Sequence, residues 1–411
     1  MSISSGSLSV EEFHGPYGPF QVSELVLQRI WLEGAFDQER LCDRAGRSIV
    51  VESPGVWNRL DGPDFLDARL LVDGERVVGD VEVHFCLGDW NAHGHQFDAG
   101  YNKVALHVVY HPPRSRDRPV FKENGDLLEC AALMPALWYS LEEYACDDSI
   151  IASTGVRFSE QVERLMERGR EERRLYLVER ARERWRAKRY FAAKRIERLG
   201  WEGACHQTAL EVLGYARNRV PMLMVAERFP LLGLLDGSVD ADALWLAGGD
   251  RWRPRGSRPA NHPRLRLQQY LAWVRTRPCW PDLLAEFGNQ AFCQGSSLPV
   301  QETDWGSAVL RRELGIAELG DRLTELVLAR SVGGARANTL ICDGFLPLVE
   351  AELGCDCFPF WFHWPMGDGP SEMARSLRQA HVLEPRRFPM GNGWLQGMLG
   401  MRGIEEGKSN V

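Results

Sequence analysis

The sequence predicts an α+β protein with a mixed-sheet domain over residues 1–150 and an all-helical domain over residues 151–411. Short apolar runs with alternating polarity, separated by turn dipeptides, occupy the first part of the chain. Beyond residue 157, apolar residues instead recur at helical spacing. A chain of 411 residues with 44% hydrophobic content is long enough to bury two cores.

The first elements follow from local signals. Residues 1–20 are rich in serine and glycine and are expected to be loose. A helix is expected over Ser23–Trp31, because apolar residues recur at helical spacing after a serine that can act as N-cap. Arg47–Ser53 is predicted as the first strand, and Pro54-Gly55 ends it.

A hairpin and a further strand follow. Asp73-Gly74 is a turn signal between the predicted strands Phe65–Val72 and Arg76–Phe85, which should therefore pair antiparallel. Asp89–Tyr101 is polar and is expected to be a loop or a short helix. Lys103–Tyr110 is strongly apolar and is predicted as the next strand.

The rest of the chain is predicted to be mainly helical. Past a polar hairpin at Glu123–Asp126, a helix is expected over Ala131–Tyr144, and then one long helix or two abutting helices over Phe158–Leu199. Between Arg157 and Arg198 the chain has 15 Lys/Arg against 8 Asp/Glu. The basic residues of this segment either contact the phosphate backbone of a nucleic acid or form a solvated helix face. Six more helices are predicted at Ala204–Ala216, Met222–Arg228, Pro263–Arg275, Trp280–Phe287, Gly306–Leu314 and Asp321–Arg330, and the charged tail after Gly403 is expected to be disordered.

Composition limits the partners and the compartment. The net charge of −8 means that any nucleic-acid role needs a local basic surface. The ten cysteines include no Cys-x-x-Cys pair, and the N-terminus lacks the pattern of a signal peptide. No stretch approaches the roughly 20 apolar residues that span a bilayer. We therefore expect a cytoplasmic protein with reduced thiols and no membrane contact. The oligomeric state stays open.

Ionisable residues are concentrated between residues 62 and 111. Five of the ten histidines lie there, namely His84, His93, His95, His107 and His111. Many carboxylates share the same stretch with apolar strands. Burying ionisable groups costs free energy unless they are paired or bind a ligand, so this concentration indicates a functional site.

Strand geometry selects the candidate residues. Side chains alternate along a strand, so Asp80, Glu82 and His84 should share one face, with valines on the other. A three-residue hairpin loop over residues 73–75 would place Asp64 opposite His84. A two-residue loop would turn Asp64 away unless a bulge restores it.

Paired carboxylates at the end of a strand suit a hard divalent cation, Mg²⁺ or Mn²⁺. We expect Asp64 and Glu82 to bind the ion, with Glu24 as an outer ligand. Such an ion activates water and stabilises negative charge in the transition state. His84 would assist the water or the metal.

The element order, together with Pro63-Asp64 and Glu82-Val83-His84, resembles the core of the PD-(D/E)xK nuclease superfamily. The resemblance implies a restriction-endonuclease-like sheet with metal and catalysis at these two motifs. His84 stands where the superfamily has lysine. A neutral imidazole is no fixed cation, so Lys103 on the next strand is the candidate for the missing charge.

A second resemblance covers most of the chain. The sequence resembles the domain of unknown function 2851 family, a bacterial family without an established activity. The blocks that carry the resemblance are Gly62–Phe65, Gly79–His84, Asp89-Trp90, His93–His95, Ala99–Asn102, Leu106–Val109 and Arg258–Asn261.

Further residues are candidates for substrate binding. His93, His95 and Asp98 either meet the substrate or hold a metal, and the alternative for the two histidines is a loop whose imidazoles bond the backbone. His107 is predicted as a core histidine. The Pro/Arg-rich segment 251–264 offers three candidate phosphate contacts, Arg251, Arg255 and Arg258.

The leading hypothesis is a metal-dependent phosphodiesterase, a nuclease acting on nucleic acid, with Asp64, Glu82, His84 and Lys103 in the catalytic site. The second is a non-catalytic module on a decayed nuclease-like fold that binds nucleic acid or protein. The third is a metal-dependent hydrolase of small substrates that uses His93, His95 and Asp98.

Overall fold

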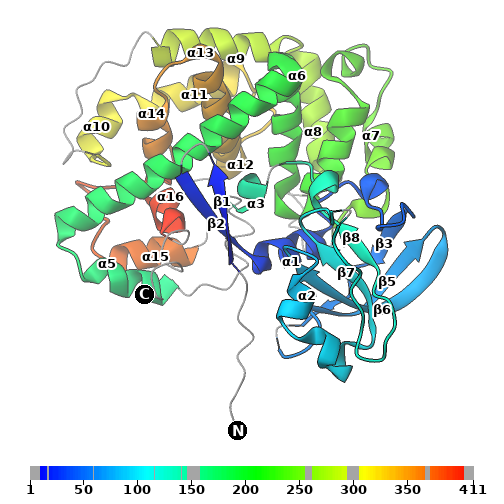
Figure 1. The fold of residues 1–411 in the computed structure, drawn as a ribbon. Coiled ribbons are helices and arrows are strands. Elements are labelled where there is room, and N and C mark those ends of the chain that lie inside the picture. The colour runs from blue at the N-terminus through cyan, green and yellow to red at the C-terminus, as the bar shows by residue number, and fades with distance from the viewer. Residues whose placement is uncertain are drawn as a thin grey trace. The chain divides into compact units, whose positions relative to one another are not determined.

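The computed structural model describes residues 10–15, 18–58, 60–114, 116–139, 141–145, 158–254, 262–293, 305–365 and 371–401. They form one unit within Met1–Gly155 and another within Val156–Glu405 (Figure 1). The first is built on a mixed sheet and the second is mostly helical, so the predicted α+β class is confirmed. Among the described residues, no helix combines the length and apolar character that crossing a bilayer requires.

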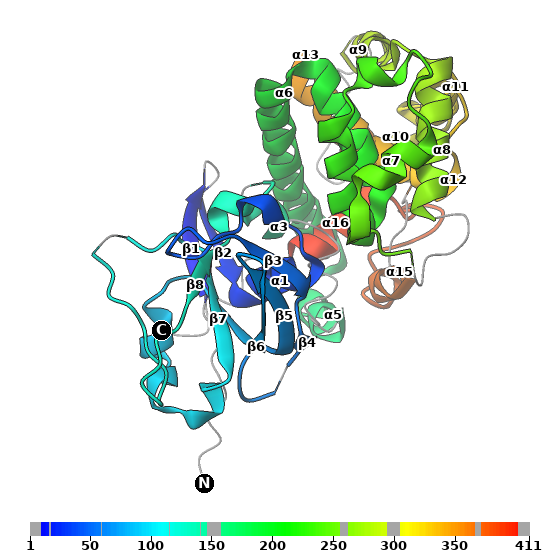
Figure 2. The same ribbon diagram turned by 90° about the vertical axis from the view of Figure 1, so that its right-hand side faces the viewer.

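The strands of the first unit are β1 (Val10–Gly15), β2 (Gly18–Ser23), β3 (Ile49–Ser53), β4 (Val56–Trp57), β5 (Phe65–Val72), β6 (Glu75–His84), β7 (Val104–Val109) and β8 (Cys130–Ala132). β1 and β2 pair antiparallel, so the expectation that residues 1–20 are loose is wrong for the described part. The other strands form one sheet in the order β3-β5-β6-β7-β8, with β4 also paired to β5 (Figure 2). β5 and β6 are antiparallel, whereas β6, β7 and β8 run parallel.

The β5–β6 hairpin decides where the predicted site residues lie. Val72 pairs with Glu75, which leaves the two-residue turn Asp73-Gly74 with φ values of 48° and 84°. The three-residue loop is therefore wrong. The register then shifts between Phe65 and Ala68, where Asp67 has a φ of 55°. Such a bulge adds one residue to β5 and reverses the facing of the residues before it.

The connection from β6 to β7 contains most of the histidine-rich segment. It forms α2 (Asp89–Ala92) and two 3₁₀ turns, η2 (His95–Phe97) and η3 (Ala99–Tyr101). A parallel strand pair requires such a crossover. The connection is anchored by apolar residues that share one core with β7 and β8: Leu87, Trp90, Tyr101, Val104, Val109, Val120, Leu128 and Cys130.

Helix α1 (Glu24–Glu33) confirms the first predicted helix. Ser23 takes the extended N-cap conformation, although its side chain makes no capping hydrogen bond, and Gly34 ends the helix in the left-handed region. Leu27 and Trp31 are fully buried. The helix packs on β6, so its first turns lie near the strand that carries Glu82.

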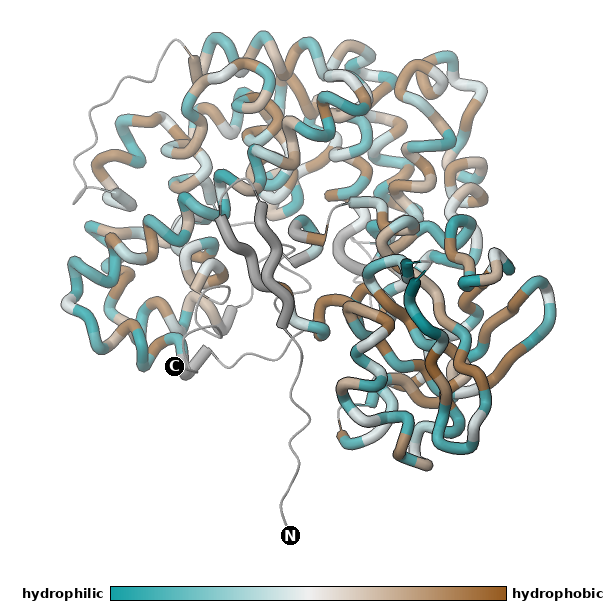
Figure 3. Tube along the Cα trace, viewed as in Figure 1, coloured by the Kyte–Doolittle hydropathy of each residue, from teal (hydrophilic) through white to brown (hydrophobic). Residues whose placement is uncertain are grey.

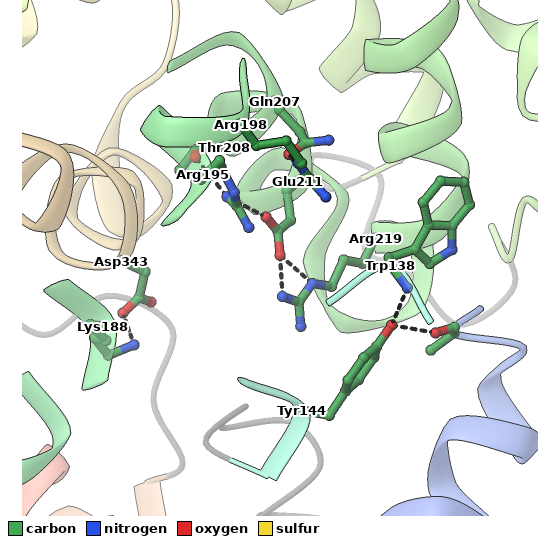
Figure 4. Close-up of polar contacts among 11 residues, drawn as sticks. Trp138, Tyr144, Lys188, Arg195, Arg198, Gln207, Thr208, Glu211, Arg219 and Asp343 are labelled. Atoms are coloured by element: carbon green, nitrogen blue, oxygen red, sulfur yellow. Dashed lines mark hydrogen bonds and ion pairs between the residues drawn. The ribbon is translucent and has the colours of Figure 1, made fainter. Parts of the chain in front are cut away.

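The predicted helix Ala131–Tyr144 is wrong. The segment instead contains the end of β8, the 3₁₀ turn η4 (Met134–Ala136) and α3 (Leu141–Ala145). Residues 130–132 pair with β7, and Pro135 has no N–H to continue a helix. The hydroxyl of Tyr144 donates to the carbonyl of Ala35 at 2.6 Å, which fixes α3 within this unit (Figure 4).

The second unit consists of helices. They are α5 (Phe158–Met166), α6 (Arg170–Arg228), η5 (Leu231–Leu234), α7 (Ala241–Ala247), η6 (Gly249–Arg251), α8 (Pro263–Thr276), α9 (Trp280–Gly288), η8 (Asn289–Cys293), α10 (Ala308–Glu313), α11 (Ile316–Leu326), α12 (Gly334–Leu340), η10 (Ile341–Phe345), α13 (Leu346–Leu353), α14 (Phe358–His363), α15 (Ser371–Gln379) and α16 (Asn392–Gly400). Hydrophobic and hydrophilic residues are interspersed along α6 (Figure 3), and no single apolar stripe runs along its whole length. The helices after residue 330 were not among those predicted.

The helical run α6 turns back on itself, and ion pairs hold the turn. Gly200 has a φ of 70°, which lets the chain change direction there. Arg195 consequently reaches Thr208 at 2.6 Å and the carboxylate of Glu211 at 2.8 Å (Figure 4). Glu211 also pairs with Arg219. Part of the positive charge of the basic segment is thus neutralised inside the unit.

A buried histidine in this unit makes stability depend on pH. His206 Nε2 lies 2.9 Å from the carbonyl of Phe229, and Nδ1 lies 2.6 Å from the hydroxyl of Tyr270. The Nε2–H tautomer satisfies both contacts, because it donates to the carbonyl and accepts from the hydroxyl. Burial lowers the pKa of His206 to about 4.

Between that pKa and the unfolded value of about 6.5, the unfolded state binds more protons, so acid should favour unfolding. We expect His206 to cost about 2 kcal/mol of stability between pH 7 and pH 5. The His206→Gln variant keeps hydrogen-bonding groups but does not titrate. Its unfolding free energy should therefore fall by about 2 kcal/mol less between pH 7 and pH 5 than that of the unaltered protein. Urea unfolding of both proteins at each pH measures the difference, and equal losses would contradict the prediction.

Candidate metal centre

Asp64 and Glu82 lie together at the start of β5 and near the end of β6. The bulge in β5 places Asp64 beside Glu82 rather than His84, and the backbone N–H of Asp64 donates to Glu82 Oε2 at 3.0 Å. The Asp64 carboxylate accepts from the backbone N–H of Val83 at 3.0 Å and from Gln28 Nε2 at 2.6 Å. The side chain of Gln28 on α1 and the backbone N–H groups of Asp64 and Val83 therefore fix this pair.

Glu82 links these carboxylates to the histidines. Its Oε1 lies 3.3 Å from His84 Nε2 and 3.3 Å from His95 Nε2. Glu82 and His84 are buried, and the side chain of His95 is only 11% exposed. A single buried carboxylate thus faces two imidazoles, one from β6 and one from the β6–β7 connection.

Three histidines converge within this network. His84 Nε2 lies 3.0 Å from His93 Nδ1, and one ring nitrogen each from His84, His93 and His95 lie within 4.8 Å of one another. In the part of the chain that the structure describes, this is the one group of three such side chains placed to share an ion. His93 is exposed, so the group opens to solvent on its side.

The carboxylates differ in their affinity for protons. Burial raises the pKa of Asp64 well above its usual value, and the charges of Glu82 and Glu24 raise it further. Burial also acts to raise the pKa of Glu82, but hydrogen bonds and charge from His84 and His95 outweigh it and lower the pKa to about 2. Glu82 is therefore ionised, whereas Asp64 favours its protonated form.

Two of the histidines, His93 and His107, have lowered pKa values and so favour the neutral form. Burial lowers the pKa of His93, and neighbouring His84 and His95 lower it further. Burial likewise lowers the pKa of His107 well below its usual value. Neutral imidazoles are the form that binds metal.

His107 lies behind the cluster on β7. Its Nε2 is 2.9 Å from His84 Nδ1, and its own Nδ1 is buried without a hydrogen-bond partner among the described residues. The predicted core position of His107 agrees with its complete burial, but its partner is a histidine of the cluster. His84 therefore uses both of its ring nitrogens, Nδ1 toward His107 and Nε2 toward Glu82 and His93.

Two aromatic residues form a wall beside His95. The ring of Tyr101 stacks on His95 with centroids 3.9 Å apart, and Trp90 meets His95 edge-on at 5.2 Å. Trp90 donates from its indole to the carbonyl of Phe121 at 3.0 Å, which fixes the wall to the core. Burial, together with the charges of Glu82 and Asp64, raises the pKa of Tyr101, so its hydroxyl keeps its proton.

Several predicted residues lie apart from the cluster. The Lys103 side chain is exposed, and no contact with Asp64 or Glu82 is found for it within the described residues. Asp98 is also exposed and accepts from the N–H of Gly100 at 2.8 Å as the N-cap of η3. Arg251 pairs with the neighbouring Asp250 at 3.3 Å. Arg255 and Arg258 lie outside the described residues.

Sequence reasoning missed the roles of two residues. Gln28 lies one helical turn after Glu24, so the i, i+4 spacing of two polar residues on the same helix face as apolar Leu27 and Trp31 was the available signal. Its side chain bridges Asp64 and the indole of Trp57, which donates to Gln28 Oε1 at 3.1 Å. Tyr101 had no such signal, because its position depends on the fold of the β6–β7 connection.

Comparison with known families identifies the chain. The model of the family described as "Protein of unknown function (DUF2851)" matches residues 24–244, and the chain belongs to this family. The match covers the whole candidate centre. Neither the curated proteins nor the solved structures give a match. The family resemblance is therefore confirmed, while the comparisons offer no support for the resemblance to PD-(D/E)xK nucleases.

Proposed function

We propose that this member of the DUF2851 family is a divalent-metal-dependent hydrolase of phosphodiester bonds. The convergence of His84, His93 and His95 beside the carboxylate of Glu82 carries the proposal. Imidazoles with a carboxylate suit Zn²⁺ and the later transition metals, whereas Mg²⁺ prefers oxygen ligands. The donor set therefore favours Zn²⁺ over Mg²⁺, and Mn²⁺, which the carboxylate suits, is the second candidate.

The two carboxylates suit opposite roles in acid–base chemistry. An ion at the histidines would lower the pKa of a bound water. Glu82 is ionised and can take the proton of the attacking water, since its Oε1 faces the same histidines. Asp64, whose pKa is raised, can give a proton to the leaving oxygen. Neighbouring groups with pKa values pushed apart are typical of such acid–base pairs.

Two further residues would support this chemistry. When His84 uses Nε2 toward an ion, its Nδ1–H can donate to His107 Nε2, 2.9 Å away, and this bond holds the ring in place. The hydroxyl of Tyr101 keeps its proton beside the carboxylates, so it can donate to an oxygen of the substrate.

The order of the elements supports a phosphodiester as substrate. From α1 with Glu24 onward, the order is β3 and β4, then β5 after Asp64, β6 with Glu82 and a parallel β7. This is the order that the nuclease resemblance implies. The proposal that the natural substrate is a nucleic acid rests on that resemblance. Arg251, which was predicted to contact phosphate, is paired with Asp250 and does not add support.

Hydrolysis of a simple diester tests the proposal. The full-length protein is stripped with EDTA and assayed with bis(4-nitrophenyl) phosphate, single-stranded DNA and RNA. We expect no turnover in the stripped protein and recovery with Mn²⁺ or Zn²⁺. Metal binding without hydrolysis of any substrate would instead favour a non-catalytic binding module. Hydrolysis of 4-nitrophenyl acetate but of no phosphodiester would favour a hydrolase of small substrates.

A further inference from the structure

Three cysteines converge in the helical unit, away from the histidine cluster in sequence. Cys355 and Cys357 lie between α13 and α14, and Cys293 ends η8. The sulfur atoms of Cys355 and Cys357 are 3.7 Å apart. Cys293 also lies within hydrogen-bonding reach of Cys355. One thiol is therefore flanked by two others from different parts of the chain.

The backbone around Cys355 is fixed by specific contacts. Gly354 ends α13 in the left-handed region with a φ of 72°. The N–H of Cys357 donates to Glu350 Oε2 at 2.8 Å, and the indole of Trp185 donates to the same oxygen at 3.1 Å. The N–H of Phe358 donates to Asp356 Oδ1 at 3.1 Å. The short separation of the two thiols thus belongs to an ordered turn.

Accessibility and acidity distinguish the three thiols. Cys355 and Cys293 are partly exposed, whereas Cys357 is buried. Hydrogen bonds from Cys357 and Cys293 lower the pKa of Cys355 to about 6, although burial opposes this shift. Burial raises the pKa of Cys357 well above its usual value. Cys355 is therefore a reachable thiolate at neutral pH, and the neighbouring Cys357 stays protonated.

We propose that Cys355 is a modification site for hydroperoxides and ends in a disulfide with Cys357. The Cys355 thiolate attacks the terminal oxygen of the peroxide, so an S–O bond forms and the O–O bond breaks. The leaving oxygen takes a proton and departs as water or an alcohol. The sulfur of Cys357 then attacks the Cys355 sulfur, and the displaced hydroxide leaves as water with the Cys357 proton. The two thiols supply the two electrons that reduce the peroxide.

Peroxide treatment of the full-length reduced protein tests this site. The remaining thiols are blocked with N-ethylmaleimide, and the peptides are mapped by mass spectrometry. We expect the peptide with Cys355 and Cys357 to lose two hydrogens and to take no label. Cys42 and Cys279 are exposed cysteines outside the cluster and serve as internal controls. Cys355 should react only a few times faster than they do, because a more acidic thiolate is also a weaker nucleophile.

Two variants test whether Cys357 or Cys293 forms the disulfide with Cys355. In Cys357→Ser we expect no disulfide and a sulfenic acid at Cys355 that dimedone traps. In Cys293→Ser we expect the disulfide to form as in the unaltered protein. A disulfide lost in Cys293→Ser would overturn the choice of Cys357. If Cys357→Ser does not fold, the experiment on the unaltered protein still tests the proposal. After peroxide treatment, N-ethylmaleimide labelling of Cys355 to the same extent as Cys42 and Cys279 would overturn it.

Discussion

Replacing Glu82 with glutamine should reduce metal-dependent phosphodiester hydrolysis by about 10²–10⁴-fold, the usual contribution of a general base. Glutamine has the same shape, and its amide oxygen can still accept the N–H of Asp64, which Glu82 accepts at 3.0 Å. It has no charge to attract His84 and His95 and cannot take a proton from water. The measurement is kcat/KM for bis(4-nitrophenyl) phosphate with saturating Mn²⁺.

A carboxylate elsewhere in the same sheet provides the matched control. Glu52 on β3 pairs with exposed Arg76 at 2.9 Å. The Glu52→Gln variant should hydrolyse the diester at the rate of the unaltered protein. Thermal unfolding of both variants shows whether the fold is kept. An unchanged kcat/KM in Glu82→Gln would show that Glu82 is not a catalytic residue.

Strands β3, β5, β6 and β7 were predictable because their signals are local. Asp73-Gly74 between two alternating runs indicates a two-residue hairpin turn, since glycine and aspartate tolerate positive φ. The bulge at Asp67 has no such signal. Its aspartate at a φ of 55° is stabilised by tertiary contacts, including the bond from its N–H to Asp80 Oδ1 at 3.0 Å. Strand existence could therefore be predicted, but not the register that places Asp64 beside Glu82.

The same limit explains the helix wrongly predicted over residues 131–144. Alanine, leucine and methionine favour a helix, yet Cys130–Ala132 pair with β7 in the sheet. Pairing with a strand more than twenty residues earlier is a tertiary effect that propensity does not contain. The strands β1 and β2 were missed for the related reason that their serine- and glycine-rich surroundings carry no alternating pattern.

The candidate centre was predictable as a region but not as a set of ligands. A surplus of histidine and carboxylate beside apolar strands indicated the right stretch. Which imidazoles meet depends on the β6–β7 connection, because its short turns bring His93 and His95 back to His84. Asp98 lies in the same connection but caps η3 instead. Residue type and spacing cannot distinguish a side chain that joins the histidine cluster from one that caps a turn.

Metal titration should locate the ion at the histidines rather than at the carboxylate pair. We expect His93→Ala to weaken Mn²⁺ or Zn²⁺ binding by about 100-fold or more, because even residues that only orient metal ligands contribute about 10–100-fold. His93 is exposed, so its loss should leave the fold intact. Asp64→Asn should weaken binding by less than the about 10-fold of an orienting residue, since the variant keeps the backbone N–H that donates to Glu82. Isothermal titration calorimetry of EDTA-stripped protein measures both.

His381 supplies the control for losing an exposed histidine. It has a φ of 54°, a conformation that asparagine tolerates, so His381→Asn should fold and bind the ion normally. The opposite pattern, with affinity lost in Asp64→Asn and kept in His93→Ala, would place the ion between Asp64 and Glu82. In that case Mg²⁺ or Mn²⁺ held by oxygen ligands would replace the histidine-bound ion. The histidines would then act on the substrate instead of the metal.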